Sequence, residues 1–417
     1  MSVYVIEGGR RLSGEVGVQG SKNSALPILA ATLLCRGECV LYNCPQLSDV
    51  EASLMILRYI GCTARREGDV LIVDTAGVNR FDIPPELMHR MRSSIIFLGA
   101  MIARFSRARM TFPGGCELGP RPIDLHLSAL RAMGAEISEE HGELDCRVND
   151  TLSGAAITLP IPSVGATENI MIAAAAARGT TVITNAAREP EICDLADFLN
   201  ACGADIRGAG ESAVVIQGAE RLRPADHTII PDRIVAATLM SAAAVTGSDI
   251  RLKNMVPSHL SAVLPVFRES GCEINQTGGS LDFRAPYRLK APRLVRTAPY
   301  PGFPTDAQAP LMSMAAVADG ITVFVENMFE SRYGHVGELC RLGADIRVEG
   351  KVAVVDGVRR LLSARVRARD LRGAAALVVA ALNAKGTSVI EGVEYLERGY
   401  DSFELVLSAL GAQMKKI

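Results

Sequence analysis

Residues 167–204 read TENIMIAAAAARGTTVITNAAREPEICDLADFLNACGA, and this stretch decides the fold. An alanine-rich helix is followed by β-branched residues at 180–184, a polar turn and an amphipathic helix that Gly203 ends. Glycine is favoured directly after a helix because it adopts the left-handed conformation at little cost. Residues 204–207 and 213–217 then alternate in polarity around a glycine-rich turn, which predicts a hairpin. The predicted unit is therefore helix, strand, helix, hairpin.

The end of this unit occurs six times along the chain. In each copy an amphipathic segment closes on a glycine between small or apolar residues, and these glycines are 61, 134, 203, 271, 343 and 411. The spacing of 68 to 73 residues is too regular for chance and too long for a solenoid repeat of roughly 20–50 residues. Because 417 residues exceed the usual size of a single core, we expect two domains with three copies each.

The first helix of each copy is apolar on nearly all sides, which is typical of a buried helix. The predicted buried segments are 25–34, 95–102, 170–177, 234–245, 311–318 and 374–382. The second helix has one apolar stripe, so its other side is expected to face solvent. We expect one domain over 22–230 and the other over 1–21 and 231–417. The N-terminal segments that we expect to complete the last copy are 2–6 and 14–18.

The composition excludes several classes of protein. Hydrophobic residues make up 48% and charged residues 22% of the chain, as in soluble globular proteins. The net charge of -2 predicts no bulk attraction to nucleic acid or membrane. Ten scattered cysteines form neither a C-x-x-C pair nor a zinc-spaced cluster, and this usage suits a reducing cytosol. With no signal-peptide pattern and no apolar run long enough to span a bilayer, the expected location is the cytoplasm.

Polar clusters precede the buried helices, and several of them contain a cation. Serine, threonine and aspartate cap helix N-termini, and we expect capping to account in part for Ser163 and Thr305. Capping does not explain the cations at four helix starts, which are Lys22, Arg92, Arg233 and Arg372. A positive charge there opposes the helix dipole unless an anion lies beside it, and helix N-termini bind phosphate and carboxylate well. The clusters therefore predict an anionic ligand shared by several helix starts.

Arginines occupy equivalent turns in three of the copies, at Arg121, Arg332 and Arg398. A lone arginine in a loop is usually an exposed, solubilising residue. Three at equivalent places indicate a site for several negative charges, because guanidinium groups bind phosphate and carboxylate in bidentate fashion.

Two further residues are candidates for chemistry. Cys116 lies in a polar, glycine-rich loop close to Arg121, a setting that activates a thiol and leaves it accessible; a loop thiol without a role is the alternative. Asp306, at a helix start, is either a cap or a base for a substrate hydroxyl. His126 and His335, at the starts of amphipathic helices, are expected to be ordinary surface histidines.

Together these motifs resemble the UDP-N-acetylglucosamine 1-carboxyvinyltransferases, an enolpyruvyl transferase family. The resemblance extends over the whole chain, and the segments that carry it are 20–27, 113–116, 121–126, 163–167, 231–234, 300–306, 370–372 and 398–400. The resemblance implies an inside-out α/β barrel of two similar globular domains, three units each, with the active site in the cleft between them. It implies a step of peptidoglycan (cell wall) synthesis in which the enolpyruvyl group of phosphoenolpyruvate moves to the 3′-hydroxyl of UDP-N-acetylglucosamine and phosphate is released. The implied reaction is an addition followed by an elimination, without metal or organic cofactor, and we expect a monomer.

The resemblance also implies roles for individual residues. Cys116 is the implied proton donor to the methylene carbon and can form a covalent adduct with phosphoenolpyruvate. Asp306 is the implied acceptor of the hydroxyl proton, while Lys22, Arg121 and Arg398 hold phosphate and carboxylate. The implied contacts of the nucleotide sugar are Arg121, Pro122, Ile123, Asp124, Leu125, Ser163, Val164, Asp306 and Met328. The other implied substrate contacts are Asn23, Arg92, Asp232, Arg233, Arg332, Asp370 and Arg372.

One departure and two alternatives remain at this point. Ile161 stands where the family often has a lysine, so a cation contact to the diphosphate is missing or comes from elsewhere. A 5-enolpyruvylshikimate-3-phosphate synthase would share the fold and the reaction type but use another acceptor. A six-unit DNA clamp would line its channel with basic helix faces, whereas the repeated helices here are apolar.

Overall fold

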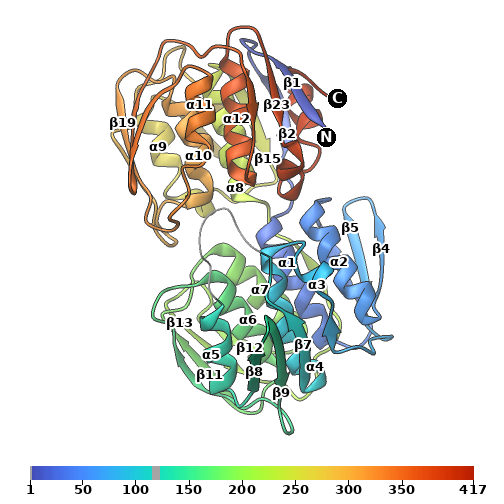
Figure 1. The fold of residues 1–417 in the computed structure, drawn as a ribbon. Coiled ribbons are helices and arrows are strands. Elements are labelled where there is room, and N and C mark those ends of the chain that lie inside the picture. The colour runs from blue at the N-terminus through green and yellow to red at the C-terminus, as the bar shows by residue number, and fades with distance from the viewer. Residues whose placement is uncertain (1, 115–122) are drawn as a thin grey trace. The chain divides into compact units, whose positions relative to one another are not determined.

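The computed structural model describes residues 2–114 and 123–417, and the chain divides into two compact units (Figure 1). Unit 1 contains residues 2–19 and 231–417, and unit 2 contains residues 20–114 and 123–230. Each unit has its own hydrophobic core. Three of the predicted site residues, Cys116, Arg121 and Pro122, lie outside the described residues.

The third copy shows the plan that all copies share. Strand β11 (Thr180–Thr184) pairs antiparallel with β13 (Ala213–Gln217), which forms a hairpin with β12 (Asp205–Arg207). A short strand, β10 (Ala156–Thr158), lies parallel to β11 at the edge of the sheet. The hairpin and the central strand are confirmed. The edge strand was not predicted, because three residues are too few to show an alternating pattern.

The same four-stranded order recurs in the other sheets. In unit 2 the strand order of one remaining sheet is β14 (Asp226–Thr228), β3 (Glu38–Tyr42), β5 (Val70–Asp74), β4 (Thr63–Glu67). The strand order of the other is β6 (Asp82–Ile83), β7 (Arg107–Thr111), β9 (Glu143–Arg147), β8 (Glu136–Glu140). In unit 1 the strand order of the first sheet is β2 (Ser13–Gly17), β15 (Asp249–Lys253), β17 (Ser280–Arg284), β16 (Glu273–Thr277). The strand order of the second sheet is β18 (Leu294–Arg296), β19 (Ile321–Val325), β21 (Val352–Asp356), β20 (Asp345–Glu349). The third is β22 (Arg365–Arg367), β23 (Thr387–Glu391), β1 (Val3–Glu7), β24 (Gln413–Lys416).

The two N-terminal strands belong to different copies. Strand β1 pairs with β23 and β24 and completes the last copy, as predicted; Figure 1 shows it in blue beside the red C-terminal strands. The prediction for segment 14–18 is wrong, because β2 pairs in parallel with β15 of the fourth copy. Four sheets take their edge strand from the chain that precedes the buried helix of the same copy, and these strands are β6, β10, β18 and β22. The other two edge strands are exchanged: β14 precedes α8 but pairs with β3 of the first copy, and β2 precedes α1 but pairs with β15 of the fourth copy.

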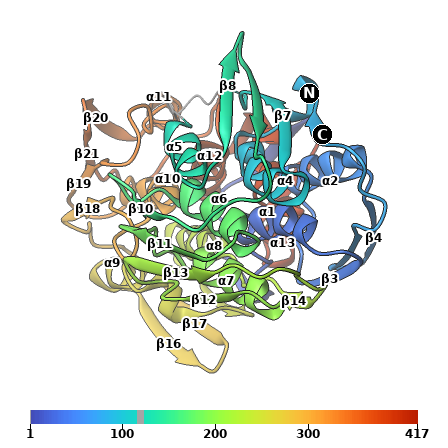
Figure 2. The same ribbon diagram turned by 90° about the horizontal axis from the view of Figure 1, so that it is seen from below.

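The first helix of each copy is buried, as predicted. These helices are α1 (Lys22–Ala31), α4 (Phe97–Phe105, continuing the 3-10 helix η2, Arg92–Ile96), α6 (Val164–Ala175), α8 (Arg233–Val245), α10 (Thr305–Ala315) and α12 (Leu371–Asn383). Figure 2 shows α1, α4 and α6 inside the strands of unit 2. Because α10 begins six residues before the predicted segment 311–318, it includes Asp306.

The second helices are α2 (Ser48–Ile60), α5 (Asp124–Ala132), α7 (Pro190–Ala201), α9 (Leu264–Glu269), α11 (Val336–Arg341) and α13 (Phe403–Ala409). The chain also forms α3 (Pro85–Met88) and the 3-10 helices η1 (Thr32–Leu34), η3 (Pro257–Leu260) and η4 (Val393–Arg398). The glycine after each second helix has a positive φ, including 107° at Gly203, so the left-handed termination is confirmed. Within the described residues, none of the helices combines the length and apolar character needed to cross a membrane.

Candidate active site

Asp306 lies in the first turn of α10 in unit 1, where two arginines hold it. Arg332 Nη2 donates to Asp306 Oδ1 at 2.8 Å, and Arg372 Nη2 donates to Oδ2 at 2.7 Å. The arginine side chains are 2% and 3% exposed, whereas the Asp306 side chain is 28% exposed. Burial opposes the charge of Arg372, but Asp306 raises the pKa of Arg372 above its ordinary value. An accessible carboxylate therefore rests on two buried cations.

Further donors of the two arginines join the buried helices of unit 1. Arg332 Nε and Nη2 donate to the carbonyl oxygen of Thr305 at 3.3 and 2.9 Å. Arg372 Nη1 donates to Tyr400 Oη at 3.2 Å, and Tyr400 Oη shares a hydrogen bond of 2.9 Å with Thr238 Oγ1. Through these bonds α8, α10 and α12 are tied together around the carboxylate.

Side chains cap three of the buried helices. Asp232 accepts hydrogen bonds from two backbone N–H groups at the start of α8, and Asp370 does the same at the start of α12. Ser163 caps α6, as predicted. The capping prediction for Thr305 is wrong: a proline occupies the cap position, and Thr305 Oγ1 instead donates to Glu326 at 3.1 Å.

Glu326 is a buried carboxylate that the sequence did not single out. It accepts hydrogen bonds from the backbone N–H groups of Met328 and Phe329 at 2.8 and 3.1 Å. These bonds fix the turn that carries Met328, a predicted nucleotide-sugar contact. Because Glu326 also accepts from Thr305, it ties this turn to the start of α10.

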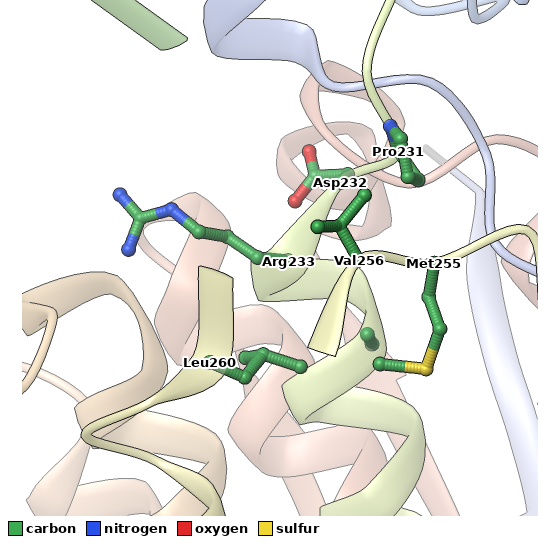
Figure 3. A pocket seen from close by; sticks show the side chains of 7 residues that line it. Pro231, Asp232, Arg233, Met255, Val256 and Leu260 are labelled. Atoms are coloured by element: carbon green, nitrogen blue, oxygen red, sulfur yellow. The ribbon is translucent and has the colours of Figure 1, made fainter. Parts of the chain in front are cut away.

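Arg233 lies at the start of α8 beside a small hollow of about 160 Å³, which is shown in Figure 3. The hollow is lined by Pro231, Asp232, Arg233, Ala236, Met255, Val256 and Leu260. Figure 3 shows the Arg233 side chain extending away from Met255. Its guanidinium carbon lies 5.4 Å from the ring centre of Tyr300, a cation–π contact.

Arg398 ends η4 and is partly buried. Gln19 fixes the backbone that follows it. Gln19 Nε2 donates to the carbonyl oxygen of Gly399 at 3.3 Å, and Gln19 Oε1 accepts from the N–H of Asp401 at 2.8 Å. No sequence pattern points to Gln19, because its partners lie about 380 residues away in the chain.

Lys22 is the first residue of α1 in unit 2 and forms an ion pair with Asp49. The distance between Lys22 Nζ and Asp49 Oδ2 is 3.3 Å, and both side chains are largely buried. The anion beside Lys22 at this helix start is therefore a carboxylate of the chain itself, that of Asp49. The partly buried Asn23 follows in the same turn.

Arg92 is the first residue of η2, and its Nη1 lies 3.5 Å from the carbonyl oxygen of Pro113. Gly114 packs tightly here, because a Cβ at this position would lie 2.7 Å from the carbonyl oxygen of His89. Only glycine fits without a shift. Arg92 is thereby held against the segment that leads toward Cys116.

The predicted nucleotide-sugar contacts of unit 2 lie at two helix starts. Ile123 precedes α5, followed by the exposed Asp124 and the partly buried Leu125. The other start is that of α6, with Ser163 as its cap and Val164 as its first residue. Ile161, just before this cap, is 62% exposed, so no buried apolar contact explains the departure from lysine.

The expectation of surface histidines is wrong for both candidates. His126 is 7% exposed and His335 is 4% exposed. His126 lies in the first turn of α5 and His335 is the residue directly before α11, and both of these helices pack against a buried helix. His126 Nδ1 shares a hydrogen bond of 3.0 Å with Asn169 Nδ2, and Asn169 is a second polar residue that the sequence did not single out.

The predicted residues share positions at the ends of elements within each unit. In unit 1, direct bonds link Asp306, Arg332 and Arg372, while Asp232, Arg233, Asp370 and Arg398 lie at the ends of neighbouring elements. In unit 2, Lys22, Asn23, Arg92, 123–125, Ser163 and Val164 all lie at or beside helix starts. Across residues 2–114 and 123–417 we find no group of three or more potential metal ligands.

Comparison with known proteins identifies the family. Residues 6–407 match the family described as EPSP synthase (3-phosphoshikimate 1-carboxyvinyltransferase). UDP-N-acetylglucosamine 1-carboxyvinyltransferase 2 of Caldanaerobacter subterraneus subsp. tengcongensis is 48% identical over the full length of both chains. UDP-N-acetylglucosamine 1-carboxyvinyltransferase 1 of Carboxydothermus hydrogenoformans is 47% identical over 100% of this chain and 99% of its own. The chain belongs to the UDP-N-acetylglucosamine 1-carboxyvinyltransferase family.

Solved structures agree with this family of carboxyvinyl transferases. The enolpyruvyl transferase NikO from Streptomyces tendae has a TM-score of 0.90 and 26% identity, with 100% of this chain and 98% of that chain covered. An EPSP synthase from Acinetobacter baumannii has a TM-score of 0.75 and 20% identity, over 100% and 99%, which supports the fold alone. The predicted family and inside-out α/β fold are confirmed. The DNA clamp is excluded, and the EPSP-synthase alternative is less well supported, because the full-length relatives cited above carry the other name.

Proposed function

We propose that this chain transfers the enolpyruvyl group of phosphoenolpyruvate to the 3′-hydroxyl of UDP-N-acetylglucosamine and releases phosphate, in peptidoglycan synthesis. The observation that carries the proposal is the 48% identity over the full length of a relative with this name. The cations at helix starts support it, because both substrates carry several negative charges. In the addition step the sugar oxygen bonds to C2 of phosphoenolpyruvate while C3 gains a proton. In the elimination step C3 loses a proton and the C2–phosphate bond breaks.

Asp306 is proposed to accept the proton of the sugar hydroxyl. Its side chain is the exposed member of the Asp306–Arg332–Arg372 group, so a substrate can reach it. Each carboxylate oxygen keeps a second lone pair beside its arginine bond and can still accept a hydrogen bond from the hydroxyl. Cys116 is proposed to donate the proton to C3 and to be the site of the covalent adduct.

Lys22, Arg121 and Arg398 are proposed to bind the phosphate and carboxylate of phosphoenolpyruvate. Asn23, Arg92, Asp232, Arg233, Arg332, Asp370 and Arg372 complete the proposed polar contacts. The nucleotide sugar is proposed to contact 121–125, Ser163, Val164, Asp306 and Met328. We further propose that the enzyme has the two lobes 22–230 and 1–21 with 231–417, and that it is a cytoplasmic monomer.

An acceptor comparison tests the proposal. Phosphate release from phosphoenolpyruvate is measured with UDP-N-acetylglucosamine and, separately, with shikimate 3-phosphate. We expect release with the nucleotide sugar alone, and the enolpyruvyl ether as the second product by mass spectrometry. Release with shikimate 3-phosphate alone would establish the alternative function.

A variant at Cys116 tests the proton donor. Cys116→Ala is expected to lose nearly all turnover and to keep the circular dichroism spectrum and melting temperature of the wild type. Cys340→Ala is the matched control, because Cys340 is an exposed thiol in α11 of unit 1. Full turnover by Cys116→Ala would contradict the role of Cys116 but not the choice of acceptor.

A further inference from the structure

Asn169 is a fully buried amide on α6 that contacts three other segments of unit 2. Its Oδ1 accepts a hydrogen bond from the N–H of Gly99 at 2.8 Å, at the start of α4. Its Nδ2 donates to the carbonyl oxygen of Ile95 at 3.1 Å, in η2. The same Nδ2 lies 3.0 Å from Nδ1 of His126, in α5. One side chain therefore joins α6 to the segments that begin with Arg92 and follow Ile123.

These bonds determine how the amide and the imidazole are oriented. A backbone N–H only donates and a carbonyl only accepts, so Gly99 faces the amide oxygen and Ile95 faces the amide nitrogen. The second N–H of Asn169 then donates to His126 Nδ1, which must carry no proton. A neutral imidazole has one proton, and in His126 that proton is on Nε2.

Close packing leaves little freedom to this arrangement. A Cβ at Gly99 would lie 2.4 Å from Asn169 Oδ1, so the amide lies directly against the α4 backbone. A Cβ at Gly165 would lie 3.3 Å from Cε1 of His126. The His126 ring therefore lies against the first turn of α6 at Gly165 and is bonded to the buried amide.

We propose that Asn169 is a positioning residue for the nucleotide-sugar site. It holds His126 neutral with its proton on Nε2, and it fixes the α5 turn that carries 123–125 against the α6 turn that carries Ser163 and Val164. This inference rests on the proposed function, because those turns are the proposed contacts of the nucleotide sugar. Asn169 itself is buried beneath these turns and acts through them.

The variant Asn169→Asp separates the hydrogen-bond pattern from packing. The carboxylate has the same shape and still accepts from Gly99, but it donates neither to Ile95 nor to His126. We expect the proton of His126 to move to Nδ1. The KM for UDP-N-acetylglucosamine should rise by roughly tenfold or more, since small displacements of binding groups cost large factors. The KM for phosphoenolpyruvate should change much less.

Asn200→Asp is the matched control in the same unit. The Asn200 amide also makes one donor and one acceptor bond with backbone, both to Ile206, but at the far end of α7. This variant should keep both KM values. Equal increases of the KM for UDP-N-acetylglucosamine in the two variants would indicate a general structural effect and overturn the inference.

The tautomer of His126 can be measured directly in the wild type. Nitrogen-15 NMR of histidine distinguishes the two neutral tautomers, and the spectrum of His126→Gln assigns the signal among the six histidines. A neutral ring protonated on Nε2 at pH 7.5 supports the inference, and a proton on Nδ1 or a charged ring overturns it. Wild-type enzyme that is inactive with UDP-N-acetylglucosamine would contradict the proposed function instead, whatever tautomer is observed.

Discussion

Asp306 is the counter-ion of two arginines whose side chains are almost fully buried. Removing one partner of a buried ion pair leaves an uncompensated charge and costs about 3–5 kcal/mol. We therefore expect Asp306→Ala to destabilise unit 1 by at least several kcal/mol, in addition to abolishing activity. Thermal melting should show the loss, and Asp356→Ala, at an exposed strand position of the same unit, should melt as the wild type does. An unchanged melting temperature for Asp306→Ala would mean that the arginines do not need this carboxylate.

His335 makes the stability of unit 1 depend on pH. Burial lowers the pKa of His335 from 6.5 to about 4, with Arg332 acting in the same direction and Asp370 opposing it. Between pH 6.5 and 4 the unfolded chain binds a proton at this residue that the folded chain does not. Stability therefore falls as the pH falls through this window, by about 1.4 kcal/mol for each unit of pKa difference.

We expect His335→Gln to remove part of this pH dependence. The fall in melting temperature between pH 7 and pH 5 should be smaller in His335→Gln than in the wild type. His89→Gln, which changes an exposed histidine, should keep the wild-type dependence. Parallel curves for wild type and His335→Gln would show that His335 does not cause it.

At the residue scale, the sequence revealed the cations and Asp306 and missed Asp49 and Asn169. Lys22 and Arg372 were detectable because a positive charge is unusual at a helix start. Asp49 was not, because an acidic residue in the first turn of an amphipathic helix is common. Asn169 was not, because a single polar residue within an apolar helix does not interrupt the helical period. The inward direction of His126 and His335 also depends on tertiary packing, which local sequence does not encode.

At the element scale, the glycine that ends each second helix is the strongest local signal in the chain. Gly203 has a φ of 107°, and no atom lies within 4 Å of the position that a Cβ would take. The cost of Gly203→Ala is therefore backbone strain alone, about 1–2 kcal/mol. Gly337→Ala is the control, since Gly337 lies inside α11 with open space around it, and alanine there should stabilise by roughly 0.5–1 kcal/mol. Denaturant titration should give opposite signs for the two variants.

Elements with a clear period were predicted, and short ones were not. The buried helices, the hairpins and the closing glycines follow from apolar patterns and from Gly203 and its equivalents. Edge strands of two to five residues, such as β10, lack enough positions for a pattern. The partner of β2 was assigned wrongly, because strand pairing over more than 200 residues is decided by the whole unit.

At the scale of the whole molecule, the strands of unit 2 come from one uninterrupted range of the sequence, and the strands of unit 1 do not. Residues 20–230 contain every strand of the three unit 2 sheets described above. Residues 231–417 lack β1 and β2, which belong to two sheets of unit 1. We expect the fragment 20–230 to melt cooperatively by circular dichroism, and the fragment 231–417 to show no cooperative transition.

A circular permutation that places residues 1–19 after residue 417 should restore cooperative melting to the fragment 231–417. Val3 and Ile417 exchange two backbone hydrogen bonds of 2.9 Å, so a short linker can join the C-terminus to the N-terminus as a hairpin turn. The fragment 231–417 followed by residues 1–19 should then melt cooperatively. Cooperative melting of 231–417 without residues 1–19 would show that β1 and β2 are dispensable.

The pairing of β1 with β24 has a consequence for how the protein is made. The ribosome produces β1 first and β24 last, so the sixth sheet cannot close until the chain is complete. Unit 2 lies between them and can fold while its downstream neighbour is still being translated. Strand β1 stays unpaired until β23 and β24 have been made, at residues 387–391 and 413–416, whereas β2 waits only until β15 has been made, at residues 249–253. Because these strands are far apart in the sequence, the nascent N-terminus is exposed to capture by a chaperone or by a second nascent chain.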